Sequence, residues 1–218
     1  MKIETESWQR QRELWPASGR HILAAYDEHS VLVYQAYRPE IGEYALEHQR
    51  FGGPWSFSRM SWIKPNFLWM MYRSGWGQKP GQEVVLAIRI AREGFDAILA
   101  AAVHSSHVPA VYGEQAEWKR QLQRSQVRLQ WDPDHDPHGQ KCERRAIQLG
   151  LRGEFLRNYA ERWCLGITDV SALAREQHAH VQGGRLNQLE TPRERVYPVR
   201  DAAVAAKLGL DAWDHSRA

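Results

Sequence analysis

Short apolar runs separated by polar turns mark the first half of the chain. Ile22–Tyr26 and Val31–Tyr37 are rich in β-branched and tyrosine residues, and Asp27–Ser30 separates them, which is the pattern of a β-hairpin. Apolar residues at helical spacing after Pro39 predict a helix that ends before the next Gly-Gly-Pro sequence. Glu83–Ile90 is a longer apolar run and predicts a buried strand.

Helical patterns are more frequent further along the chain. Pro65 is expected in the first turn of a helix over Asn66–Arg73, which Ser74-Gly75 ends. Further helices are predicted over Glu6–Leu14, Asp96–Ala102, Glu117–Gln123, Arg144–Leu151, Phe155–Trp163 and the tail, and another starts at Ile167–Val170 with Thr168 or Asp169 as its cap. Gln126–Trp131 alternates polar and apolar residues and predicts a strand. We expect a loop over Asp132–Gly139 and a last strand over Arg195–Val199. This mixed order favours an α+β fold with a mixed, mostly antiparallel sheet and flanking helices.

The length of 218 residues suits one domain. We expect a polar N-terminal arm over residues 1–20, a single α+β domain over 21–200 and a C-terminal tail over 201–218. No apolar run approaches the roughly 20 residues that span a bilayer, and the first residues are polar, so we expect neither a membrane partner nor a targeting peptide. Cys142 and Cys164 cannot form a disulfide scaffold, which favours the reducing cytoplasm.

Composition adds one clue about the ligand. The chain has 10 Trp, and its basic residues are mostly Arg. Arg presents a planar fork that suits phosphates, and Trp presents a flat stacking surface, so the two together fit a nucleotide or nucleic-acid ligand. Core burial of Trp and a codon bias toward Arg explain the same counts. The net charge of +3 is too small to indicate a nucleic-acid partner by itself.

A segment rich in cations and aromatic residues lies between positions 59 and 76. A helix that begins near Pro65 points free amide groups outward, and with Lys64 and Arg59 beside it forms a candidate phosphate seat. The alternative interpretation is that these side chains are structural. For Phe67, Leu68, Met70 and Met71 we expect that alternative, because they are apolar residues of one short helix.

A second cluster combines carboxylates and imidazoles: Asp132, Asp134, His135, Asp136 and His138. These residues are normal ligands of hard cations and of zinc. Asp132, at the end of the predicted strand, also suits a general base or a hydrogen bond to a ribose. The spacing matches no recognised zinc motif, and a solvated turn is the third interpretation. Arg145 and Arg152 follow, and we expect them either to face an anion or to neutralise this acidic segment.

Several segments together resemble the family catalogued as domain of unknown function 4291. They are Tyr26-Asp27 with Val33–Tyr37, Arg59–Met70, Gln130–His135 and Arg145–Gly153. The resemblance extends from about Ile22 to Pro198, and the Trp-Ile-Lys-Pro sequence at positions 62–65 is unusual. It implies membership of the family and no particular activity.

A weaker resemblance is to the ADP-ribosyltransferase fold, on the order strand, helix, aromatic-rich turn, helix, strand over Val31–Tyr37, Pro39–Phe51, Trp55–Lys64, Pro65–Arg73 and Val84–Ile90. It implies NAD as cofactor, held by the first strand, turn and helix, with a polar residue of a later strand at the ribose. It assigns cofactor binding to Tyr34, Gln35, Arg59, Ser61, Trp62, Lys64, Trp69, Tyr72 and Arg73, and catalysis to Gln130, Asp132 and Tyr37. The chain lacks the family's His-x-Thr on the first strand and its closing Glu, so the usual triad is not carried over.

Three functions follow from these observations. The first is an NAD-dependent ADP-ribosyltransferase-like enzyme that acts on a nucleic acid or nucleotide, since breaking the nicotinamide–ribose bond develops positive charge that a carboxylate or amide stabilises. The second is a non-catalytic nucleic-acid-binding module. The third is a metal-dependent hydrolase that uses the Asp132–His138 segment. The first requires Arg59, Lys64 and Asp132 to line one cleft.

Overall fold

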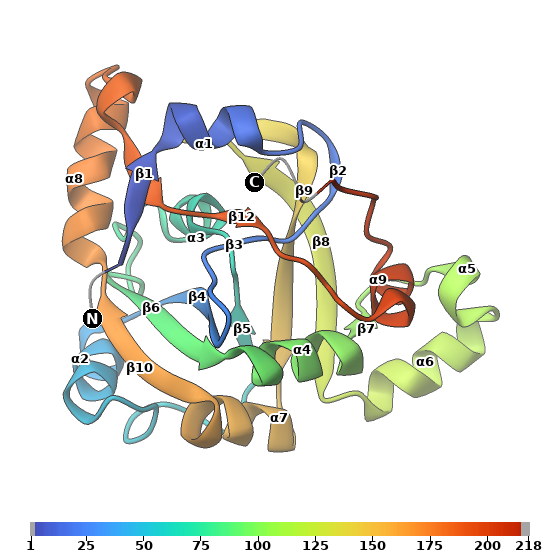
Figure 1. The fold of residues 1–218 in the computed structure, drawn as a ribbon. Helices are drawn as coiled ribbons and strands as arrows, with labels where there is room; N and C mark the ends of the chain where they lie inside the picture. The colour runs from blue at the N-terminus through green and yellow to red at the C-terminus, as the bar shows by residue number, and fades with distance from the viewer. Residues whose placement is uncertain (1–2, 215–218) are drawn as a thin grey trace.

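Two β-sheets with helices packed around them form an α+β domain, as the element order predicted (Figure 1). The computed structural model describes residues 3–214. The smaller sheet is antiparallel, in the order β10-β6-β4, and consists of β4 (Ser30–Tyr37), β6 (Val84–Ala91) and β10 (Cys164–Asp169). The larger has the order β2-β9-β8-β7 with β5 also on β9, and consists of β2 (Gly19–Arg20), β5 (Ser61–Ile63), β7 (Val103–His104), β8 (Val127–His135) and β9 (Lys141–Leu151). Two short antiparallel pairs join β1 (Thr5–Ser7) to β11 (Glu190–Pro192) and β3 (Leu23–Ala24) to β12 (Arg195–Val196).

Most of the predicted helices are confirmed with shifted ends. The helices are α1 (Trp8–Leu14), α2 (Pro39–His48), α3 (Phe67–Ser74), α4 (Arg92–Ala101), α5 (Pro109–Tyr112), α6 (Gln115–Arg124), α7 (Gly153–Arg157), α8 (Ser171–Gln182) and α9 (Ala202–Leu208). A π-helical segment, Asn158–Arg162, extends α7, and a 3-10 turn covers Leu186–Gln188. Within residues 3–214 no helix has the length and apolar character needed to cross a membrane.

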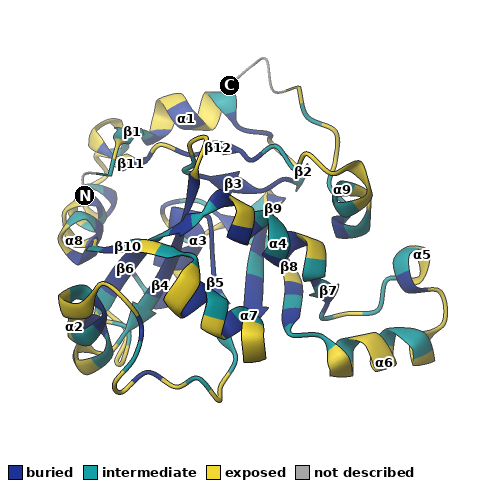
Figure 2. Ribbon diagram, turned by 60° about the horizontal axis from the view of Figure 1, so that its bottom comes forward, coloured by how far each residue is buried: buried dark blue, intermediate teal, exposed yellow. Residues whose placement is uncertain are grey.

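Both faces of β4 and β6 are buried, which explains their near-continuous apolar sequences. Val31, Val33 and Ile88 belong to a core between the two sheets. Leu32 and Ala87 face the opposite way, into a second core beneath α1, α3 and α8. In Figure 2 these strands are almost wholly buried, whereas α6 remains largely exposed.

The larger sheet buries only one face, and this asymmetry creates the space for a site. Val127, Leu129 and Leu149 are fully buried in the core between the sheets. The intervening positions hold polar residues, among them Gln130, which pairs across the strands with Gln148. Side chains alternate between the faces of a strand, so this polar row lies on the opposite face.

Three sequence predictions were wrong in this region. Arg144–Leu151, predicted as a helix, is strand β9, because its apolar residues follow a period of two and pair with β8. The first half of the predicted Asp132–Gly139 loop is strand, since β8 continues through Pro133 to His135. The helix predicted at Ile167 starts only at Ser171; Asp169 ends β10, and its Oδ1 accepts a hydrogen bond from the Ser171 amide at 2.8 Å.

The segments outside the central domain pack against it. In the predicted arm over residues 1–20, Trp8 and Trp15 are buried and β1 pairs with β11. Of the predicted tail over 201–218, α9 packs against α4, and Leu208 is fully buried. Residues 1–2 and 215–218 of these two segments lie outside the described residues.

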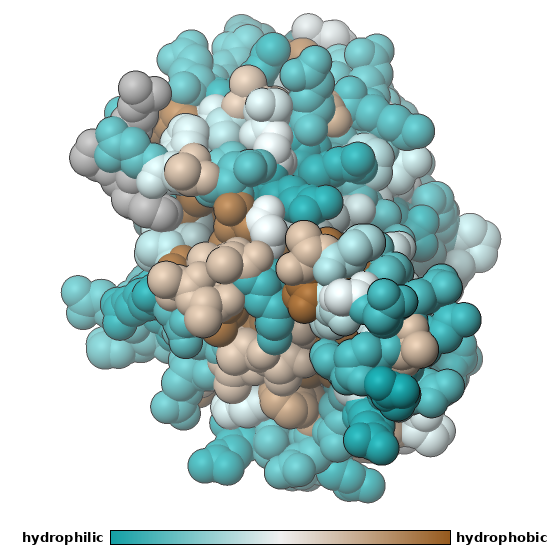
Figure 3. Space-filling view, turned by 90° about the vertical axis from the view of Figure 1, so that its right-hand side faces the viewer, coloured by the Kyte–Doolittle hydropathy of each residue, from teal (hydrophilic) through white to brown (hydrophobic). Residues whose placement is uncertain are grey.

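One side of the molecule carries α5, α6 and α9. Its surface is mainly hydrophilic around one apolar area (Figure 3). Among the described residues, none of those that line the three hollows discussed below comes from these helices.

Candidate ligand site around Lys64

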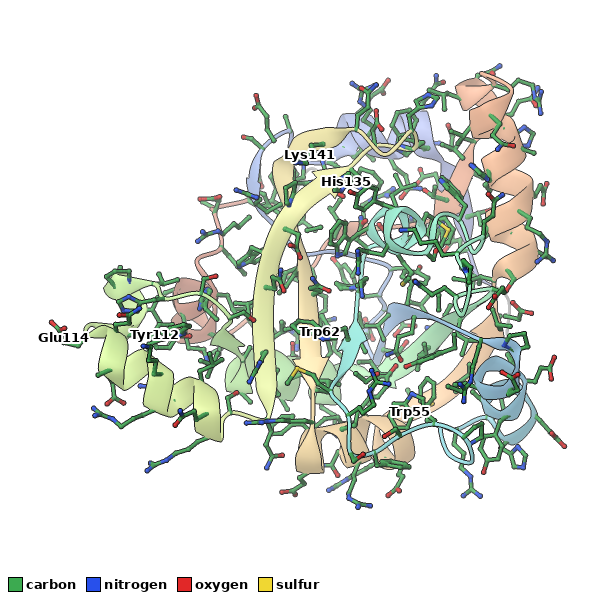
Figure 4. The ribbon with its side chains drawn as sticks, turned by 180° about the vertical axis from the view of Figure 1, so that it is seen from behind. Trp55, Trp62, Tyr112, Glu114, His135 and Lys141 are labelled. Carbon is green, nitrogen blue, oxygen red and sulfur yellow. The ribbon has the colours of Figure 1, made fainter. Side chains whose placement is uncertain are left out.

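Two neighbouring hollows open on the polar side of the molecule. The Ser61 hollow, about 370 Å³, is formed by the end of β4, residues 54–62 and α3. The Asp132 hollow, about 430 Å³, is formed by α3 and the outer face of β5, β8 and β9. Trp62, Lys64 and Arg73 line both, so the two hollows share a wall. Figure 4 shows this side, with Trp62 on β5 beside the long strands β9 and β8.

Strand alternation places Trp62 on the outer face of the sheet. Trp62 pairs with Gly150 of β9, and its neighbour Ile63 is fully buried on the core side. A Cβ atom on Gly150 would lie 2.7 Å from the Met60 sulfur and 3.1 Å from the Trp62 ring. The glycine therefore lets both side chains lie directly over β9.

Lys64 is the most unusual side chain of the site. Only 6% of the residue is exposed, yet within residues 3–214 its ammonium has no ion pair and no hydrogen bond. Burial, with a contribution from the Arg73 charge and against the attraction of Asp132, lowers the pKa of Lys64 to about 8. A buried cation without a hydrogen-bonded counter-ion is costly, so an anionic ligand at this position is favoured.

A chain of hydrogen bonds forms the floor of the Ser61 hollow. Tyr37 Oη lies 3.0 Å from Ser61 Oγ and accepts a 2.9 Å hydrogen bond from Trp55 Nε1. Gln35 Nε2 donates to Ser61 Oγ at 2.7 Å, and Gln35 Oε1 accepts from Tyr159 Oη at 2.7 Å. Burial raises the pKa of Tyr37 to about 12, so this hydroxyl stays protonated near neutral pH. The floor is therefore neutral and rigid.

Asp132 is the carboxylate of the site. Its Oδ1 accepts from Gln130 Nε2 at 3.0 Å, and its Oδ2 accepts from Gln148 Nε2 at 2.7 Å. Among the described residues that line the two hollows, no other carries a carboxylate. The two amides fix the orientation of Asp132 toward the Lys64 side of the sheet, where the two opposite charges attract.

The N-terminus of α3 is already occupied by protein groups. Asn66 caps the helix by accepting a 2.7 Å hydrogen bond from the Trp69 amide, and Pro65 lies before the cap rather than in the first turn. Glu194, 1% exposed, accepts a 2.6 Å hydrogen bond from the Phe67 amide. The phosphate seat predicted at this helix end is therefore filled by a carboxylate, and the free cations lie in the hollows instead.

The comparison with protein-family models gives a match over most of the chain. The family model described as "Domain of unknown function (DUF4291)" matches residues 21–197, which include every residue of the two hollows. The chain belongs to the DUF4291 family. No curated protein matches this DUF4291 chain.

Most of the candidate residues of the DUF4291 chain line two adjoining hollows. Arg59 and Asp132 do not line the same one, contrary to the single cleft expected, and Lys64 lies on the wall that the two hollows share. Those that line the Ser61 hollow are Gln35, Tyr37, Arg59, Ser61, Trp62, Lys64 and Arg73, and those that line the Asp132 hollow include Trp69, Gln130 and Asp132. Tyr34 lies fully buried in the core, with its ring edge-on to Phe67, and Tyr72 lies on the other side of α3. Neither of these two lines the hollows.

After Asp132, the acidic segment makes structural contacts through Asp134 and His135. Arg144 donates to Asp134 Oδ2 through Nε and Nη2 at 2.8 and 2.6 Å, and this pair is buried. His135 stacks on Tyr72 with 3.5 Å between ring centroids. No group of three or more potential metal ligands is assembled within the described part of the chain. Arg145 is exposed and Arg152 binds backbone carbonyls, so Arg144 makes the ion pair expected of those two.

Sequence reasoning missed three residues of the DUF4291 site. Trp55 lines the Ser61 hollow, Gln148 holds Asp132, and Tyr159 holds Gln35. A signal for Gln148 was present, since it alternates with apolar residues in β9 as Gln130 does in β8. No local signal marks Tyr159, because it reaches Gln35 from a segment far along the chain.

Proposed function

We propose that this DUF4291 protein is an NAD-dependent ADP-ribosyltransferase-like enzyme that acts on a nucleotide or nucleic acid. The observation that carries the proposal is the largely buried Lys64, which lines the wall common to two hollows and whose ammonium has no ion pair or hydrogen bond within residues 3–214. The donor set around it fits a dinucleotide. Arg59 and Arg73 add two cations, and the partly exposed Trp62 adds a flat indole surface beside them.

Each part of the site has a role in this proposal. Lys64, Arg59 and Arg73 bind the pyrophosphate by charge and hydrogen bonds. Ser61 and Gln35 present a hydroxyl and an amide for the polar groups of nicotinamide or ribose, and Trp62 packs against a ring. When bound, NAD supplies a ribose whose bond to nicotinamide breaks with the development of positive charge.

Asp132 provides the electrostatic part of catalysis. Its carboxylate, held by Gln130 and Gln148, is the negative group of the two hollows and stabilises positive charge that develops beside it. In this proposal Asp132 takes the place of the closing Glu of the ADP-ribosyltransferase fold, which this sequence lacks. Asp132 lies on β8, a different strand from those that carry the residues of the Ser61 floor. Both cysteines are free thiols, which fits an enzyme of the cytoplasm.

The test measures binding and cleavage separately. Isothermal titration of the purified protein with NAD is expected to detect binding that Lys64→Ala and Arg59→Ala each weaken by about tenfold or more. Lys119→Ala, on the exposed helix α6, is the charge-matched control and retains the wild-type affinity. If the wild-type protein binds no NAD, the proposal is wrong.

The second measurement follows release of nicotinamide in the presence of single-stranded DNA or RNA. Asp132→Asn keeps the shape of the side chain and removes its charge, so NAD binding is retained while the release rate falls by about 100-fold or more. If Asp132→Asn releases nicotinamide as fast as the wild type, Asp132 has no catalytic role, and the proposed NAD-binding site is unaffected by that result.

A further inference from the structure

A third hollow lies on the other side of α3. The Trp76 hollow, about 580 Å³, is formed by three segments that are distant in the sequence: α3 with the turn after it, the turn between β8 and β9, and the end of α8. Its volume lies within the range of small-molecule sites. None of its lining residues belongs to the two hollows around Lys64, so this is a separate space.

Aromatic rings form its walls. Trp76 has a positive φ of 57°, between two glycines that also have positive φ, and its amide donates to Met71 O at 2.8 Å. This conformation is unfavourable for a bulky residue, and it holds the indole stacked on His178 with 5.3 Å between centroids. Tyr72 is 39% exposed, and apart from Leu165 no large hydrophobic residue among those described is as exposed. Tyr72, which stacks on His135, therefore offers the hollow an exposed aromatic surface, whereas Trp76 is buried and forms part of the wall.

Polar groups stand at the rim of the same hollow. Asp136, in the turn between β8 and β9, uses Oδ1 to accept from the Gln140 amide at 2.8 Å. His138 and His178 also line the space, and burial lowers the pKa of His178, so its imidazole is neutral near neutral pH. A carboxylate accepts a hydrogen bond from the exocyclic amine of a base, and imidazoles donate or accept.

One cation lies beside the hollow. Lys141 begins β9 directly after the turn that carries Asp136, and its charge acts on His135, which stacks on Tyr72. Lys141 is exposed, and within residues 3–214 its side chain forms no ion pair. A flat ring with a cation beside it is the arrangement that binds an unpaired base together with a phosphate next to it.

We propose that the Trp76 hollow binds an unpaired base of a single-stranded nucleic acid, stacked against Tyr72 beside Trp76, with Lys141 on a flanking phosphate. The inference rests on the proposed function in one respect: the bound nucleic acid is then the acceptor of the ADP-ribosyl group. The ridge between the hollows is made of aromatic rings: Trp69, Tyr72 and His135 form one stacked cluster with centroids 3.5 to 5.5 Å apart. Trp69 lines the Asp132 hollow, so a base in the Trp76 hollow places the neighbouring nucleotides beside that site.

Fluorescence anisotropy with a labelled single-stranded oligonucleotide of about ten nucleotides, without NAD, tests the inference. Tyr72→Ala is expected to weaken binding by about tenfold or more, the loss typical of one stacked base. Leu165→Ala is the matched control, because Leu165 is also a large exposed apolar residue and lies on β10, outside the hollow. Lys141→Ala is expected to lower the salt dependence of binding by about one phosphate contact.

The location is checked by ultraviolet cross-linking of an oligonucleotide that carries 5-iodouracil, followed by peptide mapping. Cross-links to the peptides that contain Tyr72 or Trp76 support the inference. No binding of the oligonucleotide, equal binding by Tyr72→Ala and the wild type, or cross-links confined to other peptides each overturn it.

The outcomes separate this inference from the proposed function. If the wild-type protein binds the oligonucleotide through Tyr72 and binds no NAD, the proposed function fails and the base pocket stands. If it binds NAD and Tyr72→Ala binds the oligonucleotide as the wild type does, the base pocket fails and the proposed function stands.

Discussion

The backbone of Tyr34 on β4 exchanges two hydrogen bonds with the backbone of Lys64, at 2.7 and 3.3 Å. This antiparallel bridge joins the small sheet to the large one through the residue that follows β5. It also fixes the Lys64 side chain where the Ser61 and Asp132 hollows meet. The position of the buried cation therefore depends on the junction of the two sheets.

Lys64 makes anion binding dependent on pH. Burial lowers its pKa to about 8, so the charge that attracts an anion is present below that pH and is lost as the pH rises through it. The affinity for ADP, whose own charge changes little above about pH 7.5, is expected to fall by up to about tenfold per pH unit above about pH 8. Titration calorimetry at a series of pH values checks this. Lys64→Arg stays charged and is expected to show a flat profile; a profile as steep as that of the wild type would contradict the assignment.

Gln35 is expected to contribute to the stability of the fold as well as to the floor of the Ser61 hollow. Gln35→Met removes the acceptor of the buried Tyr159 hydroxyl and the donor to Ser61 Oγ. An unpaired buried polar group costs about 1–3 kcal/mol, so the free energy of unfolding is expected to fall by about 2–3 kcal/mol. Urea denaturation measures it. Adding Tyr159→Phe removes the orphaned hydroxyl and is expected to restore part of the loss; strictly additive losses would show that the two side chains do not interact.

The pair of Asp134 and Arg144 is expected to be structural. Both side chains are buried, and Arg144 also donates to the Pro16 carbonyl at 2.6 Å. Asp134→Ala leaves a buried guanidinium unpaired, which costs about 3–5 kcal/mol of unfolding free energy. Arg145→Ala, at the neighbouring exposed position, is expected to change stability by less than about 0.5 kcal/mol. Equal unfolding midpoints for the two variants would contradict this.

His135 is expected to make the protein sensitive to acid. Burial lowers the pKa of His135, against the opposing attraction of Asp134, so the unfolded chain binds this proton more readily than the folded one. The stability that comes from the neutral ring is present above about pH 6.5, the unfolded value, and is lost as the pH falls. His135→Phe keeps a flat ring and cannot be protonated. Its melting temperature relative to the wild type is expected to rise between about pH 7.5 and pH 5; an unchanged difference would exclude His135 as the cause.

The local sequence pattern was sufficient to predict an element where its apolar residues follow one clear pattern. The apolar runs of β4 and β6 and the helical spacing of α2 and α3 were predicted correctly, because burial on both faces or on one stripe marks the sequence directly. Strand β9 was predicted as a helix. Its two adjacent arginines and buried Ala146 mask the period of two, and only pairing with β8 reveals it.

By itself, the sequence determined the α+β class, the family and the kinds of residue that the site uses, because these depend on composition, local spacing and motif. Tertiary structure alone decided which of those residues meet. Gln35 lies on β4, Lys64 follows β5, and Asp132 lies on β8. Strands β5 and β8 both pair with β9, and the Tyr34–Lys64 bridge joins β4 to them, so the three residues reach adjoining hollows. Strand pairing is a non-local interaction, and no local pattern along the chain encodes its outcome.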